Sequence, residues 1–371
     1  FFSVWGRMGA TESLQTLIEQ NRLDEAKKIM SRPGFDVNAG FKNPPLYQAI
    51  WYNNLEAVRF LLTFPDLDVN KDGGIPLFRQ GPLYLAVHGG NIEMVKLLLA
   101  HPDIDVNKGY YCTPLMRAIE RNDMKLVRLL LQQPKIDVNH NFGHNAITKC
   151  MAYGNVEVLK LLVAHPGIQL SQWSSQLLFF ALNTFNCDLL KLLVQHPQID
   201  PNVPLNDPAN PRQGACTPFY KAVLQYSCCL NRVDYTEYKY NFWEPDFGDS
   251  PPTDDCGQGS PLCDTWKSCQ ADSQMSAQDT TLQGERMKTC LAMVEVLLSL
   301  PKCDVNKGQG TTTPLHLCAR NGFEDVTKLI FKYHPHVTTS LRDDSGRTAG
   351  EVARQSGHPA VADVIDLAQC R

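Results

Sequence analysis

The chain has 371 residues, of which 43% are hydrophobic and 20% charged, and its net charge of −4 provides no basic excess to attract phosphate. This balance argues against a nucleic-acid partner, and no apolar run reaches the ~18 residues needed to cross a bilayer. The 13 cysteines occur without a secretory signal sequence, which favours a reducing compartment, so we expect a cytoplasmic or nuclear protein.

One phrase recurs along the chain: a proline, any residue, a hydrophobic residue, and then Asp-Val-Asn. The phrase begins at Pro33, Pro65, Pro102, Pro134, Pro166, Pro197 and Pro301, and it is weaker at the fifth and sixth of these sites. Five of the six intervals between these prolines lie between 31 and 37 residues, and the last is 104. This regular spacing predicts a repeat architecture with one insertion.

Each unit between two such phrases predicts two helices. The first opens with Thr-Pro or a near equivalent, as at Thr113-Pro114, where threonine suits the N-cap and proline the first helical position. A break such as Gly90-Asn91 follows, and then a second helix with apolar residues at helical spacing, which the repeat proline ends. The Asp-Val-Asn segment suits a turn, because Asp and Asn side chains bond nearby backbone groups.

A unit of ~33 residues with a turn and two helices, and with the segment Thr313-Pro314-Leu315-His316, resembles the ankyrin repeat. The resemblance implies an all-α ankyrin-repeat solenoid of stacked helix-turn-helix units, with β-hairpin-like fingers and one long insertion. Stacking would form one continuous core, since a single helix pair cannot bury its apolar face alone. Asn145-Ala146-Ile147-Thr148 and Ser175-Gln176-Leu177-Leu178 depart from the motif in the fourth and fifth units.

The repeat pattern predicts the following organisation in chain order. We expect an N-terminal tail (1–10), an N-terminal capping helix pair (11–35), ankyrin repeats 1 to 6 with the sixth interrupted (36–225), an acidic, aromatic and Cys-containing insertion (226–290), the rest of repeat 6 with repeat 7 (291–337), and a C-terminal capping repeat (338–371).

The insertion separates Gln225, predicted to end one inner helix, from Leu291 at the start of the outer helix of the same repeat. Residues 250–280 are rich in Ser, Asp, Gln and Pro, which predicts disorder or a loosely held loop. The aromatic and acidic stretch could fold back on the repeats or serve as a docking peptide. Six cysteines lie in the insertion at spacings that do not fit a zinc knuckle, so we interpret them as reduced or oxidisable thiols.

The resemblance also implies where a partner binds, because partners of ankyrin arrays usually lie on the concave face formed by inner helices and turn tips. The family's variable positions fall on aromatic, basic and other polar residues, of which aromatics and arginine are typical of interface hot spots. The predicted contact residues are Phe41, Lys42, Trp51, Tyr52, Phe78, Arg79, His88, Tyr110, Tyr111, Glu120, Arg121, Phe142, Tyr153 and Arg320.

Four asparagines of the Asp-Val-Asn phrase have a leucine eight residues earlier, which resembles the sites modified by ankyrin-directed asparaginyl hydroxylases. These candidate hydroxylation sites are Asn70, Asn107, Asn139 and Asn306. The alternative is that each asparagine only completes its turn.

No motif for catalysis is found in the sequence. A phosphate-binding glycine loop, a nucleophile elbow and a Cys/His metal pattern are all missing, and His140 and His144 fall in a turn where solvated histidines are expected. We therefore expect no enzyme, no cofactor and no metal. The predicted function is a scaffold or adaptor that binds a protein, as a monomer and without nucleic acid or membrane. The alternatives are a substrate-recognition subunit of a ubiquitin ligase and the ankyrin portion of a longer multidomain protein.

Overall fold

The computed structural model describes residues 14–39, 44–73, 80–109, 111–140, 145–205, 215–231 and 277–369. Within these ranges the chain is helical, and β pairing is limited to isolated antiparallel bridges. The bridges join Gly73 to Gln80, Leu205 to Cys216, Gln309 to Thr312 and Arg342 to Thr348. Each bridge lies in a loop between successive helix pairs, so the predicted all-α fold with hairpin-like fingers is confirmed at these loops.

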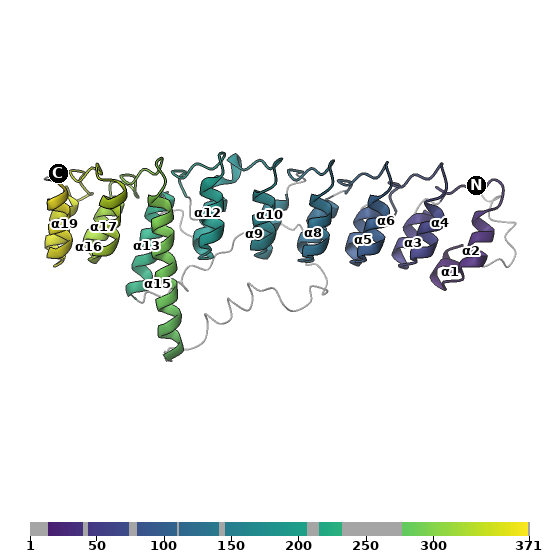
Figure 1. Cartoon of the computed structure of the whole chain (residues 1–371), viewed down its shortest axis with the longest axis horizontal. Coiled ribbons are helices and arrows are strands. Elements are labelled where there is room, and N and C mark those ends of the chain that lie inside the picture. The colour runs from purple at the N-terminus through teal and green to yellow at the C-terminus, as the bar shows by residue number, and fades with distance from the viewer. Residues whose placement is uncertain are drawn as a thin grey trace. The chain divides into compact units, whose positions relative to one another are not determined.

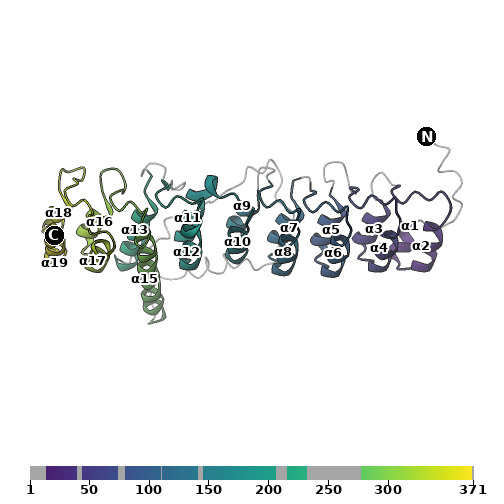
Figure 2. The ribbon, with the colours of Figure 1, turned by 45° about the horizontal axis from the view of Figure 1, so that its top comes forward.

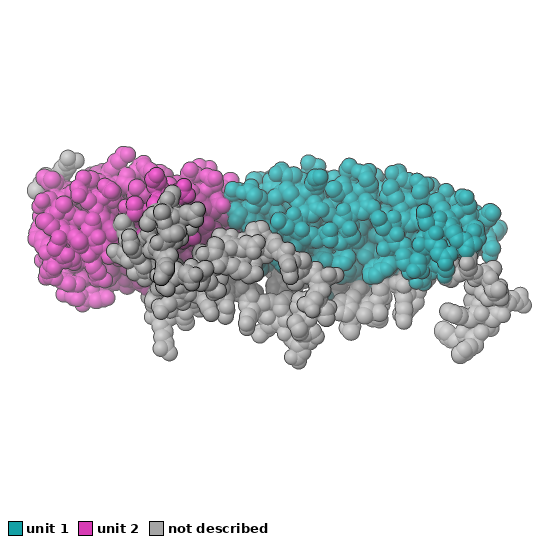
Figure 3. Space-filling model, turned by 90° about the horizontal axis from the view of Figure 1, so that it is seen from below, with its two compact units in different colours: residues 1–168 teal, residues 169–371 magenta. Residues whose placement is uncertain are grey.

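The chain falls into two compact units, residues 1–168 and 169–371 (Figure 3). The described part of unit 1 contains five helix pairs that follow one another in chain order (Figure 1). The inner helices are α1 (Leu14–Glu19), α3 (Pro45–Trp51), α5 (Pro82–Gly89), α7 (Pro114–Glu120) and α9 (Ala146–Tyr153). The outer helices are α2 (Leu23–Met30), α4 (Leu55–Leu61), α6 (Ile92–Leu99), α8 (Met124–Leu131) and α10 (Val156–Val163).

Within unit 1 each inner helix contacts its own outer helix, and the inner helices from α1 to α9 contact one another in succession. A pair in the middle of the unit therefore buries its apolar face between two neighbours, and each end pair packs against one neighbour within the unit. Met94, Val95 and Leu98 on α6 are almost fully buried, as their helical spacing predicts. Burying one such side chain contributes about 1.5–3 kcal/mol. The turns that connect successive pairs lie at one end of the helices within this unit, as Figures 1 and 2 show.

Local sequence signals set the helix ends. The Thr113 side chain accepts a hydrogen bond from the Met116 amide at 3.2 Å, and Pro114 occupies the first helical position. The fourth unit lacks the Thr-Pro-Leu-His motif. There Asn145 and Thr148 form a reciprocal capping box at the start of α9, so a different pair of side chains caps the inner helix of this unit. The predicted break at Gly90 is confirmed by its left-handed backbone, with φ of 75°.

Unit 2 contains the remaining helices, and its first helix follows a short 3₁₀ turn, η3 (Ser171–Trp173). The inner helices are α11 (Ser174–Asn183), α13 (Pro218–Asn231), α16 (Pro314–Asn321) and α18 (Ala349–Gln355). The outer helices are α12 (Cys187–Gln195), α15 (Ala277–Leu298), α17 (Glu324–Tyr333) and α19 (Pro359–Gln369).

The interrupted repeat differs from the prediction, because both of its helices continue past the expected ends. Helix α13 runs beyond Gln225 to Asn231, and α15 begins at Ala277, well before Leu291, so it extends past its neighbours in Figure 1. Residues 226–231 contain no glycine or proline that would end the helix. Tyr226 is buried, with its ring 5.3 Å from that of Phe323. The insertion predicted at 226–290 therefore begins and ends within helices. Residues 232–276, with Cys256, Cys263 and Cys269, lie outside the described residues.

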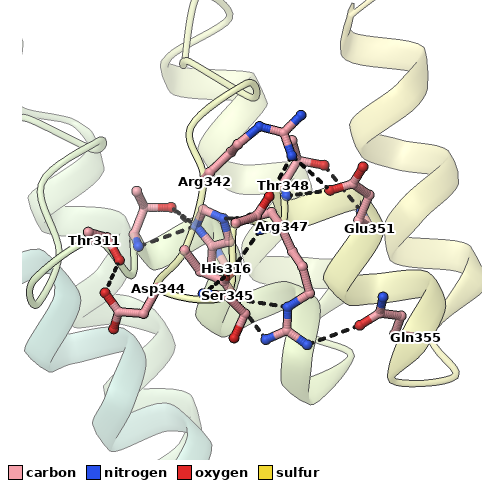
Figure 4. A network of polar contacts seen from close by, with 12 residues as sticks. Thr311, His316, Arg342, Asp344, Ser345, Arg347, Thr348, Glu351 and Gln355 are labelled. Atoms are coloured by element: carbon pink, nitrogen blue, oxygen red, sulfur yellow. Dashed lines mark hydrogen bonds and ion pairs between the residues drawn. The ribbon is translucent and has the colours of Figure 1, made fainter.

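A polar network closes the C-terminal end of unit 2 (Figure 4). His316, which is buried, places Nδ1 3.3 Å from the Thr313 amide nitrogen and Nε2 3.0 Å from the Arg347 carbonyl oxygen. Because an amide only donates and a carbonyl only accepts, the ring carries its proton on Nε2. The backbone amide of the capping residue Thr348 donates to the Glu351 carboxylate at 2.8 Å. The histidine of the Thr-Pro-Leu-His motif therefore ties one repeat to the finger of the next.

Candidate functional site

The candidate site is the surface formed by the exposed positions of α3, α5, α7 and α9 in unit 1 and of the residues just before and after these helices. We call it the inner-helix surface. In α3 the ring of Trp51 stacks on that of Tyr47 at 6.4 Å, and in α5 the ring of His88 stacks on that of Tyr84 at 6.3 Å. Residues four apart share one face of a helix, so these two neighbouring repeats each place a stacked pair of rings, a tyrosine with Trp51 or His88, at equivalent positions.

Three aromatic side chains of the inner-helix surface face solvent. Trp51 and Tyr111 are each 62% exposed and Tyr153 is 40% exposed, and they are the exposed aromatic residues of the described part of the chain. All three were predicted as contact residues. Tyr52 is less exposed, and its hydroxyl accepts a hydrogen bond from Gln15 Nε2 at 3.2 Å, which connects it to the capping helix α1.

A charged cluster joins α7 to α9. The Lys149 ammonium lies 2.5 Å from Glu120 Oε1, and Arg117 Nη1 lies 3.0 Å from Glu120 Oε2. The side chains of Glu120 and Lys149 are only 13% and 18% exposed. Burial opposes the charged form of Lys149, but the Glu120 carboxylate outweighs it and raises the pKa of Lys149. Lys149 also lies 5.8 Å from the ring centroid of Tyr153, a cation–π distance.

Arg121 extends this positive charge toward α5. Its Nη1 donates to the His88 carbonyl oxygen at 2.8 Å, across one repeat boundary, while Arg121 itself remains exposed. Burial, with Arg117 and Arg121 nearby, lowers the pKa of His88 and so favours the neutral imidazole. The left-handed glycine at Gly90 suits this contact, because a Cβ there would collide with the Arg121 guanidinium.

The remaining predicted contact residues are distributed as follows. Arg320 is exposed at the end of α16 in unit 2, outside the inner-helix surface, which is defined on unit 1 alone. Glu120 was predicted as a partner contact, and its carboxylate is engaged by Arg117 and Lys149. Phe41, Lys42, Phe78, Arg79, Tyr110 and Phe142 lie outside the described residues, as does His144.

Sequence reasoning missed Arg117 and Lys149, which complete the charged cluster. Arg117 lies three residues before Glu120, and Lys149 lies four residues before Tyr153. Both occupy the repeat position at which α5 carries a buried leucine, Leu85. A charged residue at a position that is buried in another repeat is the signal that could have identified them.

The asparagines of the repeated phrase bridge successive turns. The Asn70 amide donates to the Asp103 carbonyl at 2.6 Å and accepts from the Asp105 amide at 2.8 Å. Equivalent paired bonds are made by Asn38 and Asn107 in unit 1 and by Asn202 in unit 2. We call this series the asparagine ladder. The side chain thus does more than complete its own turn, because it joins that turn to the next repeat.

At Ser171, which replaces asparagine, a different side chain makes the bridge. Gln198, from the following turn, accepts a hydrogen bond from the Leu170 amide through Oε1 at 2.6 Å. The weaker phrase at this repeat is therefore compensated by a longer amide side chain that reaches back from the next turn.

Among the described residues, no helix is long and apolar enough to cross a membrane, and no cluster of His, Cys, Asp and Glu is arranged to hold a metal ion. A family model described as ankyrin repeats (three copies) matches residues 9–108, 46–141 and 115–207, which together cover more than half of the chain. No curated protein matches the chain.

Proposed function

The chain belongs to the ankyrin-repeat family, and we propose that it is a scaffold or adaptor that binds a protein partner on the inner-helix surface of unit 1. Ankyrin repeats are generally protein–protein interaction modules and typically have no enzymatic activity. The partner is held on the expected concave face, by a monomer in the cytoplasm or nucleus, without nucleic acid, membrane or cofactor.

The observation that carries this proposal is the exposure of Trp51, Tyr111 and Tyr153 on one surface of unit 1. Large aromatic side chains are normally buried in the protein core, and exposed ones are enriched among the interface residues that dominate binding energy. Trp51 and Tyr153 end helices that pack against neighbouring repeats, so these two rings are positioned before binding and lose little freedom in the complex.

The charges of the same surface indicate the chemistry of the partner. In the described residues of α3, α5, α7 and α9 and the residue after each helix, three cations (Arg117, Arg121 and Lys149) stand beside one carboxylate, Glu120. That carboxylate is already shared by two of the cations. A partner segment with acidic residues between apolar ones would complement this surface, and its association would weaken as salt is raised.

Affinity capture from a cytosolic extract, with the bound proteins identified by mass spectrometry, tests the proposal. Four proteins are compared: the intact chain, Trp51→Ala/Tyr153→Ala, a variant with residues 233–275 replaced by a Gly-Ser linker, and the control Leu367→Ala. Leu367 is a matched control because it is 67% exposed but lies on α19 in unit 2.

The proposal expects the partner to be lost only with the aromatic double variant. Loss with the linker variant alone would assign binding to the insertion and contradict the proposal. Subunits of a ubiquitin ligase among the captured proteins would favour the substrate-recognition alternative.

A further inference from the structure

Two cysteines face each other where the interrupted repeat enters and leaves its insertion. The Sγ atoms of Cys229 on α13 and Cys290 on α15 lie 3.8 Å apart, and the two helices pack along each other. A disulfide needs a sulfur–sulfur distance of ~2 Å, so the thiols must approach by about 2 Å, which is within reach of side-chain rotation. We propose that Cys229 and Cys290 are a redox modification site, which forms a reversible disulfide when the protein meets hydrogen peroxide.

The thiol that reacts first must be reachable by peroxide, and Cys229 is more exposed than Cys290. Cys290 is 1% exposed, whereas Cys229 is only partly buried, so peroxide reaches Cys229 first. Arg286 stands one helical turn before Cys290, on the same face of α15, and its positive charge acts on Cys229. The buried Cys290 is then the resolving partner.

The thiol of Cys229 is also more acidic than those of Cys112, Cys303 and Cys318. A hydrogen bond with Cys290, and the positive charge of Arg286, lower the pKa of Cys229 to about 7 against the opposing effect of burial. In contrast, burial raises the pKa of Cys112, Cys303 and Cys318 to about 12. A thiolate is the reactive form toward peroxide, so Cys229 is selected by its surroundings.

The reaction balances with hydrogen peroxide as the only oxidant. The Cys229 thiolate attacks one peroxide oxygen, the O–O bond breaks, and the departing hydroxide takes a proton to become water, which leaves a sulfenic acid on Cys229. The Cys290 sulfur then attacks the Cys229 sulfur, the S–O bond breaks, and the released hydroxide takes the Cys290 proton. Two thiols and one peroxide become one disulfide and two waters.

The bond would join α13 to α15 across a separation of 61 residues along the chain. A cross-link over so long a loop restricts the unfolded chain more than the folded repeat, so the oxidised protein should resist denaturant better. Oxidation would thereby fix together the two helices that flank residues 232–276.

The test uses the full chain, reduced, desalted and then treated with a small excess of hydrogen peroxide. The remaining thiols are blocked with iodoacetamide, and an unreduced digest is analysed by mass spectrometry. We expect one cross-linked peptide pair, joined through Cys229 and Cys290 and lighter by two hydrogens than its separate peptides, which dithiothreitol abolishes. In Cys290→Ser, dimedone should instead trap a sulfenic acid on Cys229.

Cys187→Ser is the matched control, because Cys187 is a partly exposed thiol elsewhere in unit 2 whose pKa is raised by burial. This substitution should leave the cross-link unchanged, and iodoacetamide at pH 7 should alkylate Cys229 roughly tenfold faster than Cys187. The proposal is overturned if Cys229 remains fully alkylatable after peroxide treatment, or if it pairs with other cysteines as readily as with Cys290. Both outcomes are read in the unsubstituted protein, so they do not depend on how a variant folds.

Discussion

The Lys149 ammonium on α9 lies 2.5 Å from the Glu120 carboxylate on α7, so one ion pair joins the inner helices of two adjacent repeats. Arg117 binds the other carboxylate oxygen. The Lys149 ammonium also lies 5.8 Å from the ring centroid of the exposed Tyr153, so an ion pair that the repeat pattern alone did not reveal contacts a predicted contact residue.

The first prediction concerns this pair. Glu120→Gln leaves Lys149 and Arg117 partly buried without a counter-charge, and it should destabilise unit 1 by about 1–3 kcal/mol. Urea unfolding followed by circular dichroism measures the change. Glu93→Gln is the control, because the Glu93–Lys96 pair on α6 is exposed, and it should leave the unfolding midpoint nearly unchanged. An unfolding midpoint of Glu120→Gln that is as little changed as that of Glu93→Gln would contradict a contribution of the Glu120 cluster to stability.

The second prediction concerns the asparagine ladder. Asn70→Ala removes two hydrogen bonds to backbone groups of the next turn, which should cost about 1–3 kcal/mol in unfolding free energy. Gln198→Ala should also destabilise the protein, since this side chain makes the bridge at the repeat that lacks asparagine. Ser171→Ala, an exposed change at the ladder position of that repeat, should have little effect in the same urea experiment. A Ser171→Ala effect as large as that of Asn70→Ala would contradict the ladder.

The third prediction is that an ankyrin-directed asparaginyl hydroxylase adds one oxygen to Asn70, Asn107, Asn139 and Asn306. Asn202 provides an internal control, because it has the same ladder bonds as Asn70 but a valine, Val194, eight residues earlier. Peptide mass spectrometry after incubation with such an enzyme measures the modified fraction of the four candidate asparagines and of Asn202. Since the amide must leave its two hydrogen bonds to be modified, a core variant such as Leu98→Ala, expected to cost about 2–5 kcal/mol, should speed the modification of Asn70. Equal modification of Asn202 would refute the role of the leucine.

The fourth prediction is a pH effect at the C-terminal repeat. Hydrogen bonds from the Arg347 guanidinium and backbone amide hold the pKa of Asp343 down at about 2, below its ordinary value of 3.8. A carboxylate with a depressed folded pKa stabilises the protein above its unfolded pKa, and that contribution is lost as the pH falls from about 4 to 2. Asp343→Asn should therefore lower stability at pH 7 and reduce the acid sensitivity in this range. Thermal unfolding of both proteins at a series of pH values measures these changes. If the unfolding temperature of Asp343→Asn falls with pH as steeply as that of the unsubstituted protein, Asp343 is not the cause of the acid sensitivity.

Much of the fold could be predicted from local patterns. The repeat phrase, the caps at Thr113 and Thr313 and the break at Gly90 lie within one unit each, where local propensity decides the structure. The lengths of α13 and α15 could not be predicted, because they depend on tertiary packing such as that of Tyr226 against Phe323.

The candidate site was predicted only in part for a similar reason. Exposure of Trp51 and Tyr153 follows from their place at the end of an inner helix, which the family pattern supplies. The Glu120–Lys149 pair joins residues 29 apart in sequence, so it depends on how adjacent repeats stack. Pairing between repeats is set by three-dimensional register and leaves no periodic signal in the sequence.

Site-specific photo-crosslinking in a cytosolic extract shows directly whether a partner binds on the inner-helix surface. A benzophenone amino acid is placed at Trp51 on the inner-helix surface or at Glu93, which is exposed on outer helix α6. We expect a cross-linked protein from position 51 that Arg121→Glu and raised salt both diminish, and none from position 93. Cross-linking of the same protein from position 93 but not from position 51 would contradict binding on the inner-helix surface.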